Sequence, residues 1–235
     1  MGYILAMTRL LDKSDSLDDF RRSVRMMGAK AERLNDIIQT MFKLMPNQRY
    51  AQRLAYAELA LPDLLEDVYL TCQPFAEQRH QRLIIDAHEK VEDFVADRAK
   101  MRDILENLIM NAIKFTPDGG TVTVRVGKQL GERASLSVID QGPGIAEKDL
   151  QRIFEPFYTG GDVLKHSTGV SGHRKQGMGL GLAVVKHFAE LHGGDVRVNS
   201  TAQGCTFIVS IPLQPPPRDS HPAEPEGSGG NETTT

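Results

Sequence analysis

The stretch Ile104-Leu-Glu-Asn-Leu-Ile-Met-Asn-Ala-Ile-Lys-Phe115 predicts a helix with two different sides. Its apolar residues recur every three or four positions, which is typical of a helix with one face packed in a core. The opposite stripe holds Asn107, Asn111 and Lys114, at spacings of four and three residues. Amide oxygens and one cation suit a hydrated magnesium ion and the phosphates that it binds. An ordinary exposed face with Asn and Lys is the alternative that this segment alone leaves open.

Two glycine segments downstream could surround a nucleotide. Asp140-Gln-Gly-Pro-Gly144 ends a predicted strand, where a carboxylate can accept from an exocyclic amine and glycine backbone can lie close to a flat ring. By itself this segment is explained equally well by an ordinary turn. Gly177-Met-Gly-Leu-Gly181 precedes a helix predicted over residues 182–192, whose N-terminal N–H groups could bind a polyphosphate.

Two common nucleotide-binding patterns are excluded. The chain contains no P-loop sequence. It also lacks the Rossmann glycine pattern, because Glu147 and Leu182 occupy positions that this pattern requires to be glycine.

A long segment without predicted helix or strand separates the two glycine segments. A loop as long as residues 158–176 is usually a functional lid or is disordered. The segment is rich in glycine and contains the cationic or titratable residues Lys165, His166, His173, Arg174 and Lys175. Phe154-Glu-Pro-Phe157 precedes it, and these two aromatic side chains could anchor its hinge in the core.

The N-terminal part predicts a helical hairpin. A short helix is expected over residues 2–11, followed by a longer one with Asp15 and Ser16 at its N-terminal cap and Pro46 at its end. Alternating steps of four and three residues form an uninterrupted heptad seam: Phe20, Val24, Met27, Ala31, Leu34, Ile38, Met41 and Met45. A seam this narrow favours contact with a second chain, and the alternative is one long helix packed on its own domain.

Predicted strands and helices alternate beyond residue 53. Strands are expected over residues 54–61, 83–86, 94–95, 122–126, 136–140, 195–199 and 205–211, and helices over 62–79 and after a cap at Asp97. This order predicts an α+β fold, a two-layer α/β sandwich with a mixed sheet and helices on one face, preceded by the hairpin. The expected divisions are a partial hairpin over 1–53, one domain over 54–213, and a disordered tail over 214–235 that has little to bury.

The composition excludes several classes of protein. The 235 residues have a net charge of −3, so no excess of basic residues favours binding to nucleic acid. No apolar run is long enough for a transmembrane segment. Cys72 and Cys205 lack the spacing of metal ligands and are expected to be buried in a reducing compartment, which favours a cytoplasmic location.

Taken together, these segments resemble the Bergerat-fold ATP-binding domain of sensor histidine kinases, over about residues 54–213. The range 107–111 is similar to the family's N box and the range 140–144 to its first glycine box. The ranges 154–157 and 177–181 are similar to its F box and second glycine box. Four such segments in the family's order make the resemblance specific. The heptad helix resembles the second helix of the dimerisation hairpin that precedes this domain.

The resemblance implies ATP and Mg²⁺ as ligands and suggests a role for each candidate residue. Asp140 would bind the adenine amine, Asn111 would ligate Mg²⁺ and Lys114 would contact phosphate. Charge on the phosphates would be neutralised by Arg174 or Lys175. The remaining nucleotide-binding positions implied by the resemblance are Asn107, Gly142, Gly144, Gly177, Gly179, Gly181 and Leu182.

Asn107 bears on the type of reaction. ATP-hydrolysing relatives of this family have a glutamate there that acts as the base for water, and an amide has no such capacity. Glu106 is rotated by about 100° around the helix. The resemblance therefore favours transfer of the phosphoryl group to a protein, with Asn107, Lys114, Arg174 and Lys175 as the catalytic positions.

The implied activity is that of a protein-histidine kinase. It would transfer the γ-phosphoryl group of ATP to a histidine of a homodimeric hairpin, for relay to the receiver domain of a response regulator. The chain has no histidine before His80, so the acceptor sequence is expected just upstream of Met1, and phosphorylation of this chain by itself is not expected. Two alternatives remain open: a non-catalytic dimerising ATP-binding regulator, and a serine kinase of the anti-sigma type.

Overall fold

The computed structural model describes residues 17–45, 54–87, 94–129, 132–159 and 178–215. The helices are α2 (Leu17–Leu44), α4 (Leu61–Glu77), α5 (Arg98–Phe115), α6 (Glu147–Leu150) and α7 (Gly181–Leu191). The strands are β1 (Ala57–Leu59), β2 (Arg82–Asp86), β3 (Phe94–Ala96), β4 (Thr121–Gln129), β5 (Arg133–Ile139), β6 (Asp195–Thr201) and β7 (Gly204–Pro212). The helix predicted over residues 2–11, the cap at Asp15 and Ser16, and the tail after residue 215 lie outside the described residues.

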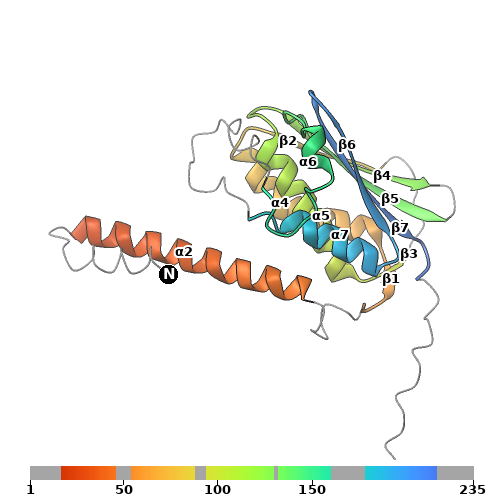
Figure 1. Ribbon diagram of the computed structural model, residues 1–235, viewed down its shortest axis with the longest axis horizontal. Coiled ribbons are helices and arrows are strands. Elements are labelled where there is room, and N and C mark those ends of the chain that lie inside the picture. Colours follow the sequence, from red (N-terminus) through yellow and green to blue (C-terminus); the bar gives the residue numbers. More distant parts are fainter. Residues whose placement is uncertain (1–16, 46–53, 88–93, 130–131, 160–177, 216–235) are drawn as a thin grey trace, which may run out of the picture.

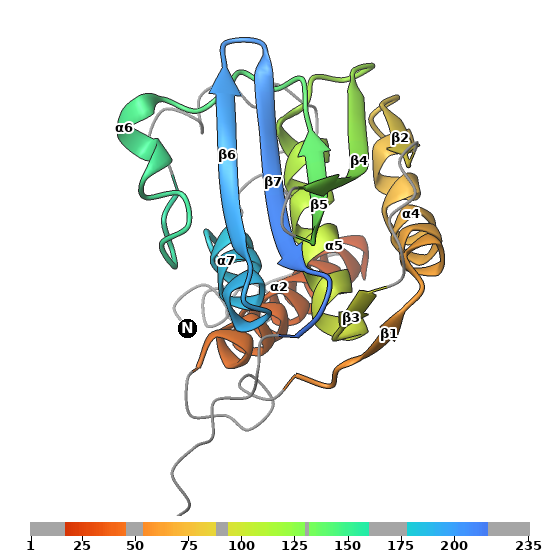
Figure 2. The same ribbon diagram turned by 90° about the vertical axis from the view of Figure 1, so that its right-hand side faces the viewer.

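A mixed sheet forms one layer of the molecule. Its strand order is β2-β4-β5-β7-β6, with β2 parallel to β4 and every other neighbouring pair antiparallel. The strands β1 and β3 pair separately as a short antiparallel ribbon. Figure 2 shows α4, α5 and α7 on one side of the sheet. The predicted two-layer α/β sandwich is therefore confirmed.

The core lies between these layers. On α5, the apolar stripe predicted from the sequence is buried, with Ile104, Leu105 and Leu108 fully inaccessible to solvent. Alternate residues of β5 point inward, as its strictly alternating burial pattern shows. Asp97 caps α5 as predicted, because its side chain accepts a hydrogen bond from the Lys100 backbone N–H. Local periodicity thus placed both the helix and its buried face.

Several element bounds differ from the prediction, and three of the differences have a clear cause. The strand expected over 54–61 is limited to Ala57–Leu59, because the Ala55 N–H donates to the Asp97 carboxylate rather than to a neighbouring strand. The strand expected over 122–126 extends to Gln129, because its hairpin with β5 continues to the pair Gln129 and Arg133. The helix α6 was not predicted, since one turn has too few residues to show a period.

Helix α2 extends away from the sandwich (Figure 1). Its last turn contacts the domain: the Lys43 Nζ lies 2.6 Å from Asp103 Oδ1, and Leu44 packs against the core. The heptad seam farther along α2 is largely uncovered, with Phe20 45%, Leu34 48% and Ile38 43% exposed. Packing on its own domain therefore accounts for one end of this helix. In the part of the chain that the structure describes, no helix combines the length and the apolar character that a membrane span requires.

Candidate functional site

Helix α7 begins against the middle of α5. A Cβ atom added to Gly181 would lie 2.7 Å from the Asn107 Oδ1, so glycine at this position leaves room for the amide. The Asn107 Nδ2 donates to the Asp103 carbonyl oxygen at 2.7 Å, which fixes the orientation of the side chain. Two of the segments singled out in the sequence are therefore in direct contact.

Asp140 is a buried carboxylate at the end of β5, and its side chain is bonded on one oxygen. Asp140 is 6% exposed, and its Oδ1 accepts hydrogen bonds from the backbone N–H groups of Gly142 at 2.8 Å and Cys205 at 3.1 Å. Burial raises the pKa of this carboxyl group, while the two backbone hydrogen bonds act in the opposite direction. Among the described residues both bonds use Oδ1, which leaves Oδ2 to accept from a ligand.

The C-terminal end of α5 lies beside Asp140. A Cβ atom on Gly142 would lie 2.9 Å from Asp140 Oδ1 and 3.2 Å from the Phe115 carbonyl oxygen. The Gln141 N–H also donates to the Thr116 Oγ1 at 3.3 Å, just after the helix ends. Helix α5 therefore contacts the first glycine segment at its C-terminal end and the second one at its middle.

The other two described glycines of these segments adopt a left-handed backbone. Gly144 has φ +78° and Gly179 has φ +69°. A side chain on Gly144 would overlap the Thr201 carbonyl oxygen, and one on Gly179 would overlap the Tyr158 carbonyl oxygen. The first glycine segment therefore packs on the turn between β6 and β7, and the second packs on the segment after Phe154.

The two aromatic residues before the predicted lid behave differently. Phe154 is half-buried and packs edge-on against Phe207, with ring centroids 6.5 Å apart, so it does anchor this segment in the core. Phe157 is 58% exposed, so the expectation that it also anchors the hinge is wrong. Its N–H donates to the Gly179 carbonyl oxygen at 2.9 Å, and its backbone rather than its ring makes the link.

The remaining described candidates lie on the same two helices. Asn111 and Lys114 are half-buried on α5, and the Lys114 Nζ lies 4.5 Å from the centroid of the Phe115 ring. Leu182 directs its side chain toward the core, so a nucleotide would meet its backbone N–H in the first turn of α7. Arg174, Lys175, Gly177 and residues 160–176 of the predicted lid lie outside the described residues.

Glu106 is held away from Asn107 by an ion pair. The Arg102 Nε lies 2.6 Å from the Glu106 Oε1, on the side of α5 that faces α4. The Arg102 Nη2 also donates to the Thr71 Oγ1 of α4 at 3.1 Å, so this ion pair lies on the α4 side of α5. The rotation expected from helical geometry is therefore observed.

Cys205 is a part of the site that sequence reasoning missed. Its backbone N–H binds Asp140 from 65 positions away in the chain, because β5 and β7 are neighbouring antiparallel strands. Its side chain is buried, as predicted for both cysteines. No local signal marks a backbone donor of this kind, and only the pairing of Ile139 with Thr206 places it there.

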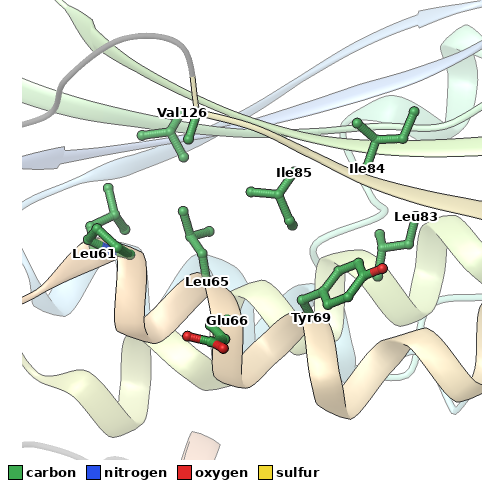
Figure 3. A pocket seen from close by; sticks show the side chains of 10 residues that line it. Leu61, Leu65, Glu66, Tyr69, Leu83, Ile84, Ile85 and Val126 are labelled. Atoms are coloured by element: carbon green, nitrogen blue, oxygen red, sulfur yellow. The ribbon is translucent and has the colours of Figure 1, made fainter.

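A separate cavity lies between α4 and β2 and has a volume of about 720 Å³. In Figure 3, Leu65 of α4 and Ile85 of β2 point into this cavity from opposite sides. The lining is mostly apolar, with Glu66 and Tyr69 as its polar members, and it includes none of the candidate residues. The first turn of α4 lines this cavity, but its described lining offers no cationic side chain for a triphosphate. The residues around α5 and α7 therefore remain the candidate nucleotide site.

What the site can do follows from its donors and acceptors. The N–H groups in the first turn of α7 have no partner within the helix and form a favourable site for phosphate oxygens. Asp140 offers a carboxylate oxygen in an enclosed position, and Asn111 and Lys114 offer an amide and an ammonium group. This donor set fits a purine nucleotide with a magnesium-bound polyphosphate.

Residues 96–215 match the protein family described as histidine kinase-, DNA gyrase B- and HSP90-like ATPase. Among curated proteins, the circadian input-output histidine kinase CikA of Synechococcus elongatus is 34% identical over 197 residues. That match covers 83% of this chain and 25% of CikA.

Two solved structures are also similar. Full-length ShkA in complex with AMPPNP has a TM-score of 0.71 and 26% identity, covering 91% of this chain and 43% of that one. The histidine kinase ThkA in complex with the response regulator protein TrrA has a TM-score of 0.65 and covers 90% of this chain and 56% of that one. At 22% identity the second likeness shows the fold alone. This chain thus spans from a quarter to little more than half of the length of these three proteins.

Proposed function

The chain belongs to the family of histidine kinase-, DNA gyrase B- and HSP90-like ATPases, and on this basis we propose that it is the ATP-binding catalytic portion of a sensor histidine kinase. It would transfer the γ-phosphoryl group of ATP to a histidine of a dimerisation hairpin, for relay to a response regulator. The observation that supports this most directly is the contact of α5 with both glycine segments, through Asn107 with Gly181 and Phe115 with Gly142.

Each group would have one task at bound ATP. Asp140 Oδ2 would accept a hydrogen bond from the adenine amine, and the N–H groups that begin α7 would donate to phosphate oxygens. Asn111 would supply an oxygen ligand to Mg²⁺, and Lys114 would contact a phosphate. Bound Mg²⁺ neutralises charge on the phosphates, and the chain's own groups orient them for transfer.

Transfer to a protein is favoured over hydrolysis by the surroundings of Asn107. Its amide is not a base, and it is bonded to the Asp103 carbonyl oxygen and enclosed by Gly181. The nearest carboxylate in the sequence, Glu106, is paired with Arg102. Neither Asn107 nor Glu106 is therefore suited to activate water.

The proposed partners follow from α2 and from the relatives. The exposed seam of α2 would form a homodimer with a second copy of the helix. A response regulator accompanies ThkA in its solved complex, and a receiver domain is the proposed phosphoryl acceptor after the histidine. A reaction that consumes ATP would take place in the cytoplasm. The relatives named above are histidine kinases, which does not favour a serine kinase of the anti-sigma type.

Calorimetry tests the nucleotide site in this chain alone. We expect the wild-type protein to bind Mg-ATP, and Asp140→Asn to weaken binding by about tenfold or more, because an amide Nδ2 would face the adenine amine with a donor. Asp63→Asn, an exposed change on α4, serves as the matched control and should have no effect. Equal affinities of the wild type and Asp140→Asn would refute this assignment of the adenine contact.

Phosphorylation assays test the kinase proposal. With Mg-ATP, this chain alone should show no acid-labile phosphohistidine. A protein in which a complete hairpin with an acceptor histidine precedes residue 17 should show it. An alkali-labile product would support the serine kinase instead, and no labelled product in the completed protein would refute the catalytic function.

A further inference from the structure

The turn between α4 and β2 contacts the C-terminal end of α5. The Arg79 Nη1 donates to the carbonyl oxygens of Ile113 and Lys114, the latter at 3.0 Å. The last carbonyl groups of a helix have no N–H partner within it, and they lie at the negative end of the helix dipole. A guanidinium group there satisfies two of them and offsets their partial charge.

Gln81 supplies a second donor to the same end. Gln81 is 5% exposed, and its Nε2 lies 2.7 Å from the Thr116 oxygen, 3.1 Å from the Ile113 oxygen and 3.2 Å from the Pro117 oxygen. Buried carbonyl groups without a donor are costly, so this amide stabilises the point at which α5 ends. Arg79 and Gln81 together thus fix the backbone from residue 113 to residue 117.

Arg79 is itself held in place. Its guanidinium pairs with Asp118, with Nη2 at 2.7 Å from the Asp118 Oδ1. Its carbonyl oxygen accepts from the Gly119 N–H at 3.1 Å. The planar guanidinium therefore bridges the end of α5 and the turn that follows it. A lysine ammonium group could not make all of these contacts, because it lacks the fixed, planar arrangement of donors.

The fixed segment is part of the nucleotide site. Lys114 lies within it, and Asn111 precedes it by less than one turn of α5. Thr116 accepts from the Gln141 N–H, and the Gln141 Oε1 accepts from the Thr121 N–H at 2.8 Å, which connects this segment to the first glycine segment. A shift of residues 113–117 would therefore move the groups proposed for Mg²⁺ and phosphate.

Asp140 has separate supports. Its carboxylate is bonded to the Gly142 and Cys205 N–H groups, and its own N–H donates to the Cys205 carbonyl oxygen at 2.9 Å. None of these three bonds involves α5 or the α4–β2 turn. Loss of the contacts from Arg79 would therefore affect the phosphate side of the site more than the adenine side.

We propose that Arg79 and Gln81 are positioning residues of the nucleotide site, which hold the last turn of α5 so that Asn111 and Lys114 meet the metal-bound phosphates. They act through the helix end and do not touch the nucleotide. This inference rests on the proposed function, because it assigns phosphate binding to that turn.

The test compares two ligands in four variants of this chain. We expect Arg79→Met and Gln81→Met each to weaken Mg-ATP binding by about tenfold and adenosine binding by less than about twofold, as measured by calorimetry. Arg82→Met is the matched control, since Arg82 is exposed and donates to Thr121 Oγ1 at 3.3 Å, outside the helix end. It should change neither affinity. Arg79→Lys keeps the charge and should recover part of the loss.

The ratio of the two affinities separates positioning from general stability. A residue that only stabilises the fold would lower both affinities together, so an unchanged ratio in Arg79→Met and Gln81→Met would overturn the inference. If either methionine variant does not fold, the ratio in Arg79→Lys decides, with a selective loss of Mg-ATP affinity as the expected result. A wild-type protein that binds no Mg-ATP would overturn the proposed function and this inference together. Wild-type binding with an unchanged ratio would overturn this inference alone.

Discussion

Asp140 is placed where a carboxylate lowers the stability of the fold. Burial raises its pKa, and no cation is paired with it among the described residues. A carboxyl group whose pKa is higher in the folded state than in the unfolded state loses stabilising free energy as the pH rises past its ordinary value of 3.8. At neutral pH the charge is therefore unfavourable for folding, which is typical of a group retained for binding.

Asp140→Asn should accordingly make the protein more stable while it weakens nucleotide binding. The amide oxygen can keep both hydrogen bonds from Gly142 and Cys205 without a buried charge. We expect the free energy of unfolding to rise by about 1 kcal/mol at neutral pH, as measured by urea denaturation. A loss of stability would show that the charge itself supports the fold.

His192 makes the stability depend on pH in another range. It is 1% exposed, its Nε2 accepts from the Asp97 N–H at 3.1 Å, and its Nδ1 donates to the Phe188 carbonyl oxygen at 2.7 Å. Burial lowers the pKa of this imidazole from 6.5, and the nearby Lys100 acts in the same direction, while the Phe188 carbonyl and Asp97 oppose it. The ring of the folded protein is therefore neutral at neutral pH.

We expect the free energy of unfolding to decrease as the pH falls from 7.5 to 5.5. A histidine with a lowered pKa in the folded state stabilises fully above its unfolded value of 6.5, and this contribution is lost as the pH falls toward the folded value. In denaturation experiments over the same range, the free energy of unfolding of His192→Gln should change less with pH than that of the wild type. His187→Gln should reduce the pH dependence as well, because burial also lowers the pKa of His187. Equal slopes for His192→Gln and the wild type would contradict this explanation.

A comparison of Gly144 with Gly119 distinguishes the cost of backbone strain from the cost of steric overlap with neighbouring atoms. Both have a left-handed backbone, with φ +78° and +81°, but a Cβ on Gly144 would overlap the Thr201 carbonyl oxygen and one on Gly119 would meet no atom within 4 Å. We expect Gly119→Ala to cost about 1 kcal/mol of unfolding free energy and Gly144→Ala about 3 kcal/mol. Thermal or urea denaturation measures both. Equal losses of unfolding free energy in the two variants would mean that the loop after Asp140 can shift to accommodate the added Cβ atom.

At the scale of elements, α5 is the centre of the domain. Its buried face packs on the sheet, its middle receives Gly181, and its end meets Gly142. Asp97 caps its N-terminus, and Arg79 and Gln81 bind its C-terminal carbonyl groups. Both ends of one helix are thus fixed by residues from other parts of the chain, so its polar stripe has a defined position.

An ion pair joins the last turn of α2 to α5. Lys43 and Asp103 lie 2.6 Å apart, with side chains 30% and 25% exposed. We expect Lys43→Met to lower the free energy of unfolding by about 1 kcal/mol and to increase hydrogen exchange in the last turn of α2. Arg22→Met, on the exposed part of the same helix, should do neither. A double-mutant cycle with Asp103→Asn that gives no coupling energy would contradict this role.

At the scale of the whole molecule, α2 presents an apolar seam that the described part of the domain leaves uncovered. Leu34 and Ile38 are more than two-fifths exposed, and Val24 is 46% exposed. A row of such residues along one helix stripe is unfavourable in water and suits a second helix. The alternating steps of four and three residues place all of these apolar side chains on one side of α2.

Ile38→Glu should therefore weaken self-association and leave nucleotide binding intact. We expect the dimer dissociation constant from analytical ultracentrifugation to rise at least about tenfold, because a charge would be placed in the seam. Gln39→Glu, one residue away and off the seam, should leave it unchanged. The Mg-ATP affinity should be the same in both variants. If the wild-type chain remains monomeric at all concentrations, the proposal that α2 is sufficient for dimerisation is refuted.

Much of the fold could be predicted because the relevant forces act within a few residues. The three- and four-residue spacing of α5, the cap at Asp97 and the alternation along β5 all follow from local geometry. The candidate residues Asn107, Asp140 and Gly181 were singled out from the sequence, and the structure places Asn107 beside Gly181, with α5 linking both to Asp140. Their roles at a nucleotide remain proposals.

The sequence by itself determined the layers, the polar stripe of α5 and the heptad seam, since hydrophobic burial imposes a period on each element. Only the tertiary structure decided that Cys205 binds Asp140, that Arg79 and Gln81 hold the end of α5, and that the ring of Phe157 faces solvent. These contacts join residues far apart in the chain. Their existence depends on the order and register of the strands, which bring groups together without leaving a period in the sequence.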